Sequence, residues 1–179
     1  MIDIEKLKYP VGNFSWPTEI TLADLDKWIS EIEAFPSLVS AEMGDLPSDG
    51  LDWRYRPDGW TIRQVIHHCA DSHFNSFVRF KLALTEDNPT IKPYEESLWA
   101  KLPDSLGPIE SSLSILTGLH KRWVVLLRSL DRQSLGATYF HPEQNASRRL
   151  DGTIGLYAWH CNHHLAHIRQ AKEAQGKYN

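Results

Sequence analysis

Histidine stands out in this chain by its number and its spacing. Nine histidines occur among 179 residues, and four of them crowd one short segment: His160, His163, His164 and His167. Since successive residues of a helix turn by about 100°, these four side chains project from one arc of roughly 100° if the segment is helical. The arc contains two pairs of histidines four residues apart, the spacing with which a helix holds a metal ion. We therefore predict a metal site on this segment.

The alternative is a packed helix face. Leu156, Tyr157 and Ala171 lie on the same side of the segment, so the arc faces a core rather than solvent. Buried imidazoles need hydrogen-bonding partners or a shared cation. Four histidines on one arc favour the cation, and a purely structural helical domain that works through dimerisation stays open beside it.

The composition predicts a single domain over residues 1–179, because 41% hydrophobic residues suffice for a sizeable core. A net charge of −4 without a basic block argues against a nucleic-acid surface. No apolar segment approaches the length of a membrane-spanning helix. Cys69 and Cys161 form no disulfide framework, and the N-terminus lacks the pattern of a signal peptide. We expect a soluble, cytoplasmic protein that does not associate with a membrane.

Apolar residues at helical spacing predict four long helices, one from near Thr21 and three over about 61–84, 109–130 and 151–175. Pro36 lies inside the first pattern and predicts a kink or an end there, with the helix resuming at Leu38. Thr61 and Gln64 form the pattern of a capping box at the start of the second helix.

Long connectors separate these helices. Residues 1–18 are expected to be irregular, and no strand pattern is found in the connector 131–150. The loop 86–108 contains four prolines and is long enough for a crossover between parallel helices. We predict an all-α protein, a four-helix bundle with a long crossover between the second and third helices.

Two stretches resemble a known family. Residues 59–68, Gly-Trp-Thr-Ile-Arg-Gln-Val-Ile-His-His, closely resemble the second helix of the DinB/YfiT-like superfamily, and residues 155–167 resemble its fourth. The resemblance extends across nearly the whole chain and is strongest to the YfiT branch. It implies a DinB-like bundle, a homodimer, and a metal-dependent hydrolase or a thiol S-transferase that uses a low-molecular-weight thiol such as bacillithiol.

The resemblance also implies a ligand set for one nickel or zinc ion per chain: His68, His160 and His164. The second-helix ligand follows the family tryptophan, here Trp60, by eight residues. Periodicity alone does not select it, because His73 is the central histidine of the apolar stripe; we expect His73 to be a core histidine bonded to a neighbouring helix. Many relatives carry Gly-Gln where this chain has Ala166 and His167, so the role of His167 stays open.

Three neutral imidazoles leave a divalent cation its full charge and an open coordination position. Such an ion turns bound water into hydroxide near neutral pH, or holds a thiol as thiolate. No carboxylate is predicted to face the arc, since Asp71 points away from the stripe, and this slightly favours thiol transfer. His141 and His167 are the candidates for acid–base or orienting work. Asn75 is a candidate for orienting substrate, or for a bond between helices.

The expected partner is a small-molecule substrate, with a low-molecular-weight thiol among the candidates. A further class of protein stays open, a bundle that binds a metal or a small molecule without catalysis. A metal site without an exchangeable water or a cleft would favour that class.

Overall fold

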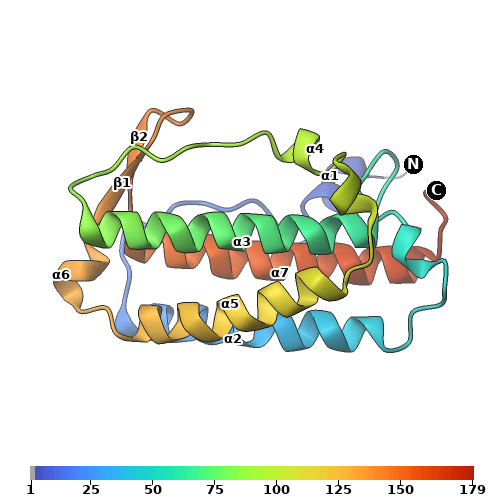
Figure 1. Ribbon diagram of the computed structural model, residues 1–179, viewed down its shortest axis with the longest axis horizontal. Coiled ribbons are helices and arrows are strands. Elements are labelled where there is room, and N and C mark those ends of the chain that lie inside the picture. Colours follow the sequence, from blue (N-terminus) through green and yellow to red (C-terminus); the bar gives the residue numbers. More distant parts are fainter. Residues whose placement is uncertain (1–2) are drawn as a thin grey trace.

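The four predicted helices are confirmed in the computed structural model, which describes residues 3–179. They form a bundle (Figure 1) from the segments α2 (Leu22–Met43), α3 (Ile62–Thr85), α5 (Glu110–Arg128) and α7 (Leu150–Ala174). Helices α2 and α7 run in one direction, and α3 and α5 run in the other. The chain between α3 and α5 therefore crosses the whole length of the bundle, so the predicted crossover is confirmed.

The crossover is fastened to the first half of α3. It carries α4 (Glu96–Trp99) and the 3-10 helix η2 (Pro103–Leu106). The amide of Gln64 donates to the Ala100 carbonyl at 2.8 Å, and His67 Nε2 donates to the Gly107 carbonyl at 3.2 Å. These bonds hold the long segment over the half of α3 that carries most of its histidines.

Two short elements correct the sequence prediction. A helix, α1 (Ile4–Lys8), lies where irregular chain was expected, and an antiparallel hairpin of β1 (Thr138–His141) and β2 (Ala146–Arg149) lies where no strand was expected. Segments of four or five residues are too short to produce a periodic signal. Asn145 turns the hairpin with a φ of 46°, a left-handed conformation that asparagine tolerates. The remaining connectors contain single turns, η1 (Gly50–Asp52) and α6 (Arg132–Leu135).

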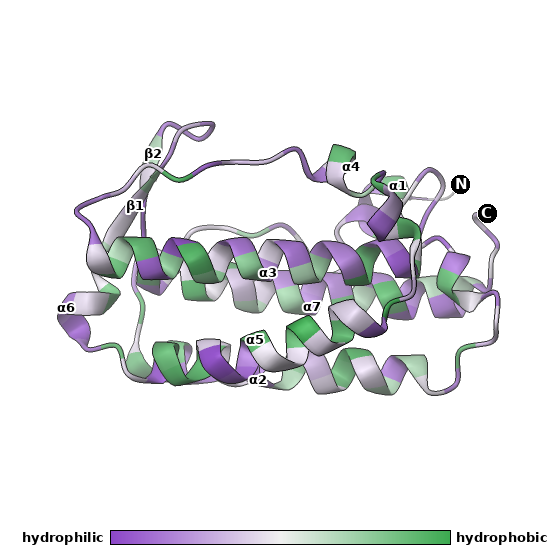
Figure 2. Ribbon diagram, in the orientation of Figure 1, coloured by the Kyte–Doolittle hydropathy of each residue, from purple (hydrophilic) through white to green (hydrophobic). Residues whose placement is uncertain are grey.

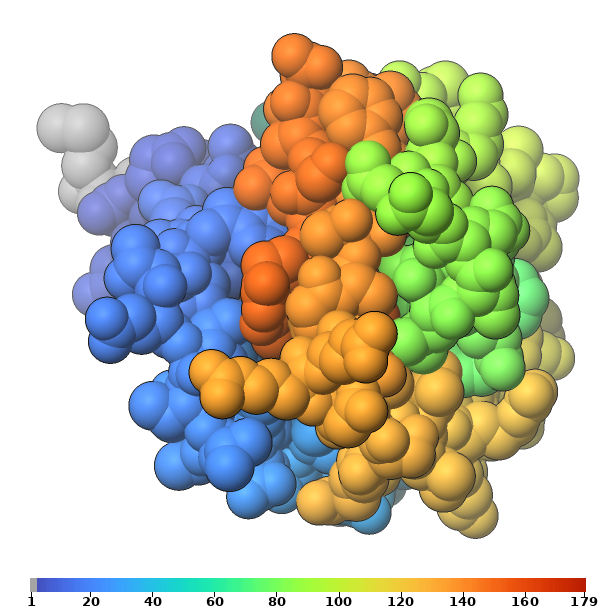
Figure 3. Space-filling model, turned by 90° about the vertical axis from the view of Figure 1, so that its left-hand side faces the viewer, coloured from blue at the N-terminus to red at the C-terminus, as the bar shows by residue number. Residues whose placement is uncertain are grey.

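The hairpin and α6 cover the end of the bundle where α7 begins (Figure 3), between the N-terminal segment and the crossover. A hollow of about 940 Å³ opens at this end, lined by residues such as Trp16, Leu25, Leu135 and Arg149. None of its lining residues is a histidine. The hollow is therefore separate from the histidine-rich part of the molecule.

The core lies between the four helices. Each contributes fully buried apolar side chains, for example Ile32, Phe80, Leu116 and Ile154, and along each helix hydrophobic residues alternate with hydrophilic ones (Figure 2). Seven of the nine histidines are buried in or beside this core: His67, His68, His73, His120, His163, His164 and His167. Over residues 3–179, none of the helices combines the length and the apolar character needed to cross a bilayer.

Helix α2 does not end at Pro36, which corrects one of the two predicted outcomes. The helix runs on to Met43, with Pro36 buried inside it. In a helix the N–H of residue 36 would bond the carbonyl of residue 32. Proline has no N–H, so the Ile32 carbonyl lacks its usual partner within the helix.

Candidate metal centre

The start of α3 sets the position of His68. Thr61 Oγ1 accepts a hydrogen bond from the backbone N–H of Gln64 at 3.2 Å, and Gln64 Oε1 accepts one from the N–H of Thr61 at 3.1 Å. This capping box begins the helix at Ile62. His68 then lies in the second turn, where its side chain is only 5% exposed.

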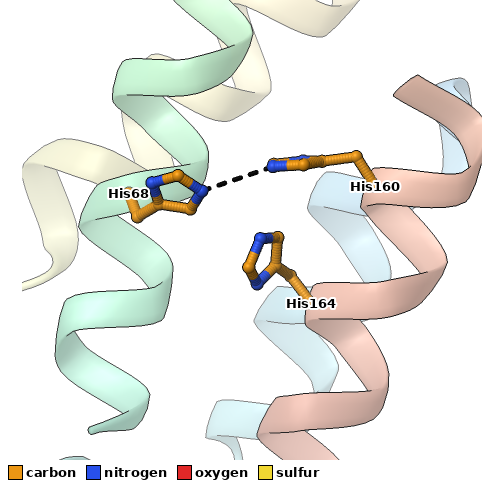
Figure 4. A group of neighbouring side chains, drawn as sticks. All are labelled: His68, His160 and His164. Carbon is orange, nitrogen blue, oxygen red and sulfur yellow. Dashed lines mark hydrogen bonds between the residues drawn. The ribbon is translucent and has the colours of Figure 1, made fainter. Parts of the chain in front are cut away.

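His68 faces two histidines of α7 (Figure 4). His160 and His164 are one turn apart, and their rings project toward α3. The Nε2 atoms of His68 and His160 are 3.3 Å apart. One nitrogen from each of the three rings lies within 4.8 Å of the others. The structure thus brings together the three residues that the resemblance implied as ligands, and their binding of a metal stays a prediction.

The spacing of the two Nε2 atoms suits a divalent ion. Metal–nitrogen bonds of about 2.0–2.1 Å at tetrahedral angles place two ligand nitrogens roughly 3.3 Å apart. The observed separation between His68 and His160 is 3.3 Å. Two bare nitrogens this close repel each other unless a proton or a cation lies between their lone pairs. The geometry and the chemistry of the donors therefore fit an ion bound by three imidazoles.

Burial keeps these imidazoles neutral. It lowers the pKa of His68 to about 4, with a smaller contribution from His163. Burial likewise holds the pKa values of His160 and His164 well below the ordinary value, and neighbouring histidines lower them further. A neutral imidazole is the form that coordinates a metal, because the lone pair is then free. At neutral pH the three rings are ready to bind without losing protons.

Aromatic rings surround the three histidines. The Trp60 ring lies 4.7 Å from that of His68, and the Tyr157 ring lies 5.5 Å from that of His160. The hydroxyl of Tyr157 donates to the Ser72 carbonyl at 3.2 Å and is thus held against α3. The groups of clustered ligand side chains found among the described residues consist of histidines and contain no carboxylate.

A second group of histidines adjoins the first and shares His164 with it. One nitrogen each of His163, His164 and His167 lies within 4.8 Å of the others. The Nε2–H of His167 donates to the Lys8 carbonyl at 3.1 Å, and its ring stacks on that of Tyr55 at 3.8 Å. His167 therefore lies one turn beyond the first group and is tied to the end of α1.

The other two candidates for a catalytic role lie elsewhere. His141 ends β1, where burial lowers its pKa and the charge of Arg79 lowers it further. Its strand is bonded to the segment just beyond α3, where the N–H of Phe140 donates to the Pro89 carbonyl at 2.9 Å. The structure does not bring His141 to the three histidines.

The amide of Asn75 donates to the Asp71 carbonyl of its own helix at 2.9 Å. This bond corrects the alternative expectation of a bond between helices. A role for Asn75 in orienting substrate stays a prediction.

The sequence predicted only part of what His73 and His120 do. The expectation that His73 bonds to a neighbouring helix is confirmed, since its Nδ1 lies 2.7 Å from Nε2 of His120. Its Nε2 also lies 3.0 Å from Nδ1 of His160, which connects it directly to the candidate metal centre. The available signal was the placement of His73 and His120 on apolar stripes, because buried imidazoles need partners.

A bundle with a crossover and an inward-facing group of three histidines defines the class of this protein. The DinB superfamily profile matches residues 31–168. The chain belongs to the DinB superfamily, as the sequence resemblance predicted.

Its relatives place it close to one branch of that superfamily. A Bacillus mycoides (strain KBAB4) protein named "Putative metal-dependent hydrolase" is 52% identical over 170 residues, which cover 95% of this chain and 98% of the relative. A Bacillus cereus (strain 03BB102) protein of the same name is 52% identical over 167 residues, which cover 93% of this chain and 96% of that protein.

Two solved structures have the same fold. YfiT from Bacillus subtilis, described as "a probable metal-dependent hydrolase with an unusual four-helix bundle topology", is 41% identical with a TM-score of 0.92. The match covers 96% of this chain and 98% of YfiT. The mycothiol-dependent maleylpyruvate isomerase has a TM-score of 0.65 at 15% identity, over 84% of this chain and 63% of that protein. The second likeness concerns the fold alone.

Proposed function

We propose that this protein is a metal-dependent enzyme in which His68, His160 and His164 hold one divalent ion, nickel or zinc, that activates a nucleophile. The observation that carries the proposal is the 3.3 Å separation of the His68 and His160 Nε2 atoms, which suits two ligands of one ion. The names of the relatives, which refer to metal-dependent hydrolases, support it. Imidazole ligands suit both metals, so the donor set does not choose between them.

The side chains of this site would hold the ion and limit the access of water to it. When bound, the ion lowers the pKa of a water that it holds to about 7, or holds a thiol as its thiolate. Three neutral ligands leave the charge of the ion uncompensated, which strengthens either effect. The rings of Trp60 and Tyr157 bound the site with low-polarity surfaces. They limit the water that would otherwise screen the ion's charge.

Hydrolysis and thiol transfer are the two versions of this function. The names of the relatives favour hydrolysis. The make-up of the site favours thiol transfer, because the groups of potential ligands found among the described residues contain no carboxylate, whereas hydrolases use a general base to activate water. A thiol that binds as its thiolate needs no such base at the moment of attack. We further propose a cytoplasmic homodimer that acts on small molecules.

The first test is elemental mass spectrometry on untagged protein purified without added metal. We expect close to one nickel or zinc ion per chain in the wild type. His68→Ala and His164→Ala should each weaken binding by at least about 100-fold, more than the 10–100-fold typical of losing an outer partner of a ligand. Metal-free wild type that takes up neither zinc nor nickel would contradict the metalloenzyme and leave a packed histidine face.

His163→Ala is the matched control, because His163 adjoins His164 on α7 and belongs only to the second group of histidines. It should keep its ion. If His163→Ala lost the ion and His68→Ala kept it, the ion would be assigned to the second group of histidines instead. Loaded protein is then assayed with ester and amide substrates, and with bacillithiol plus an electrophile; turnover in one assay alone decides between hydrolysis and thiol transfer.

A further inference from the structure

A line of hydrogen bonds crosses the bundle and visits all four long helices. It begins at the Ile32 carbonyl of α2, which lies 2.6 Å from Nδ1 of His120 on α5. Nε2 of His120 lies 2.7 Å from Nδ1 of His73 on α3, and Nε2 of His73 lies 3.0 Å from Nδ1 of His160 on α7. Each ring uses Nδ1 toward α2 and Nε2 toward the metal centre, so the line has a consistent direction.

The Ile32 carbonyl, at one end of the line, fixes which nitrogen of each ring carries the hydrogen. A carbonyl oxygen only accepts, so Nδ1 of His120 carries the hydrogen. A neutral imidazole has one N–H, which leaves Nε2 of His120 as the acceptor for the Nδ1–H of His73. By the same step, Nε2 of His73 accepts from the Nδ1–H of His160. Nε2 of His160 is then bare, and it is the atom that lies 3.3 Å from Nε2 of His68.

The line requires neutral rings, and the surroundings of His73 and His120 keep them neutral. The side chains of His73 and His120 are 0% and 2% exposed. The Phe35 ring lies 5.2 Å from that of His73 and 5.8 Å from that of His120, and Trp123 packs against both. A protonated ring would have two donors and no acceptor, so one bond of the line would break in a site that water does not reach.

Pro36 explains why the Ile32 carbonyl is available. In an uninterrupted helix that carbonyl would accept from the N–H four residues later, and residue 36 has no N–H. The carbonyl of a buried helix turn then needs another donor, and Nδ1–H of His120 supplies it at 2.6 Å. Pro36, a residue type that normally weakens a helix, thus leaves free the Ile32 carbonyl on which the line ends.

We propose that Pro36, His120 and His73 act as positioning residues that hold His160 in the tautomer whose Nε2 is free to bind the metal ion. We call this line, from the Ile32 carbonyl to His160, the histidine relay. It ends on a carbonyl that does not take up a proton, so it orients a ligand and does not export protons. The inference rests on the proposed metal site for its purpose, whereas the tautomer is a property of the metal-free protein.

The decisive measurement is a long-range ¹H–¹⁵N correlation spectrum of the metal-free wild type with labelled histidine. Protonated and bare ring nitrogens have well-separated ¹⁵N shifts, so the spectrum reports the tautomer of each ring. We expect Nδ1–H and bare Nε2 for His120, His73 and His160. A His160 ring with its hydrogen on Nε2 would overturn the relay, whether or not the protein binds a metal.

Two substitutions at His73 test the consequence for the metal. His73→Phe keeps a ring but removes the acceptor for the Nδ1–H of His160, whereas His73→Gln places an amide oxygen near the position of Nε2. Competition with a chromophoric chelator for zinc should give a Kd raised about 10–100-fold in His73→Phe, the usual effect of losing such a partner, and a Kd close to wild type in His73→Gln. Equal affinities in wild type and His73→Phe, or equal losses in both variants, would overturn the relay.

These outcomes separate the relay from the proposed function. Wild type that binds neither zinc nor nickel contradicts the function, and the tautomer of His160 still decides the relay. If the wild type binds zinc but His160 has the opposite tautomer, the proposed function is supported and the relay is contradicted.

Discussion

At the residue scale, the position of one proton decides what each imidazole binds. His160 has its Nδ1 bonded to His73, which leaves Nε2 for an ion. His164 presents one nitrogen toward the space between His68 and His160 (Figure 4), while its Nδ1 is buried without a hydrogen-bond partner. For His160, the bond to His73 thus favours one tautomer before any ion arrives.

The lowered pKa values predict that zinc binding releases few protons. Burial lowers the pKa of His68 to about 4 and depresses those of His160 and His164. At pH 6, three ordinary histidines with a pKa of about 6.5 would release about two protons per ion. We expect this protein to release well under one proton per zinc ion at pH 6. Calorimetric titration in buffers of different ionisation enthalpy measures this number.

The reference for that experiment is zinc binding by a chelating peptide with exposed histidines, titrated in the same buffers. It should release about two protons for every three histidines at pH 6. A similar release from this protein would show that its histidines are protonated at that pH, contrary to the effect of burial.

At the element scale, α2 shows how a local defect serves a distant site. Pro36 interrupts the hydrogen bonds of a helix that nevertheless continues to Met43, because buried side chains such as Phe35 and Val39 hold it in the core on both sides. The helix tolerates the missing bond because His120 supplies a replacement donor. The same exchange connects the Ile32 carbonyl, through His120 and His73, to the proposed metal centre.

Pro36→Ala should therefore weaken metal binding without touching the site. The new N–H competes with His120 for the Ile32 carbonyl, which loosens the first bond of the relay. A carbonyl accepts two bonds, so the effect should be smaller than removing a partner, roughly a 3–10-fold rise in the Kd for zinc. The same competition should shift the Nδ1–H resonance of His120 upfield.

Ser40→Ala is the control within the same turn of α2. Its hydroxyl bonds the Pro36 carbonyl at 2.9 Å, so the substitution alters the turn without giving the Ile32 carbonyl a donor. The Kd should stay at the wild-type value. A Pro36→Ala protein with wild-type affinity and an unshifted His120 resonance would show that the proline is only a helix irregularity.

At the scale of the whole molecule, buried neutral histidines make folding depend on pH. Burial lowers the pKa values of His68, His120 and His163 to about 4. Between pH 6.5 and 4 the unfolded chain binds more protons than the folded one, so stability falls as the pH falls. Each such histidine contributes a slope of up to about 1.4 kcal/mol per pH unit in that window, and none above it.

Urea denaturation of the metal-free protein at pH 7.5, 6.0 and 5.0 tests this expectation. The free energy of unfolding should fall by several kcal/mol toward pH 5, in line with the summed slopes of the three histidines. His120→Phe should show a shallower fall than the wild type, because one titrating group is gone. A free energy that is constant from pH 7.5 to 5.0 would contradict burial of neutral histidines.

The sequence by itself determined the elements whose signal is local. Apolar spacing located the four helices, the pair Thr61 and Gln64 located the start of α3, and the arc on α7 located two of the proposed ligands. The resemblance to the DinB family selected His68, which periodicity did not. The helices, the cap and the arc depend on residues within a few turns of each other, and the choice of His68 depends on a sequence motif. Local spacing and motifs are both visible in the sequence itself.

Only the tertiary structure decided the features that join distant segments. His68 and His160 are 92 residues apart along the chain, and His120 and the Ile32 carbonyl are 88 apart. Which buried imidazole faces which acceptor depends on how the helices rotate and cross, and no local period encodes that. The hairpin at β1 and β2, the bond that keeps Asn75 on its own helix and the distance of His141 from the metal centre follow from the same packing. Packing alone made Pro36, which the sequence predicts to kink or end its helix, the residue that leaves the Ile32 carbonyl free to anchor a hydrogen-bonded line to the proposed metal centre.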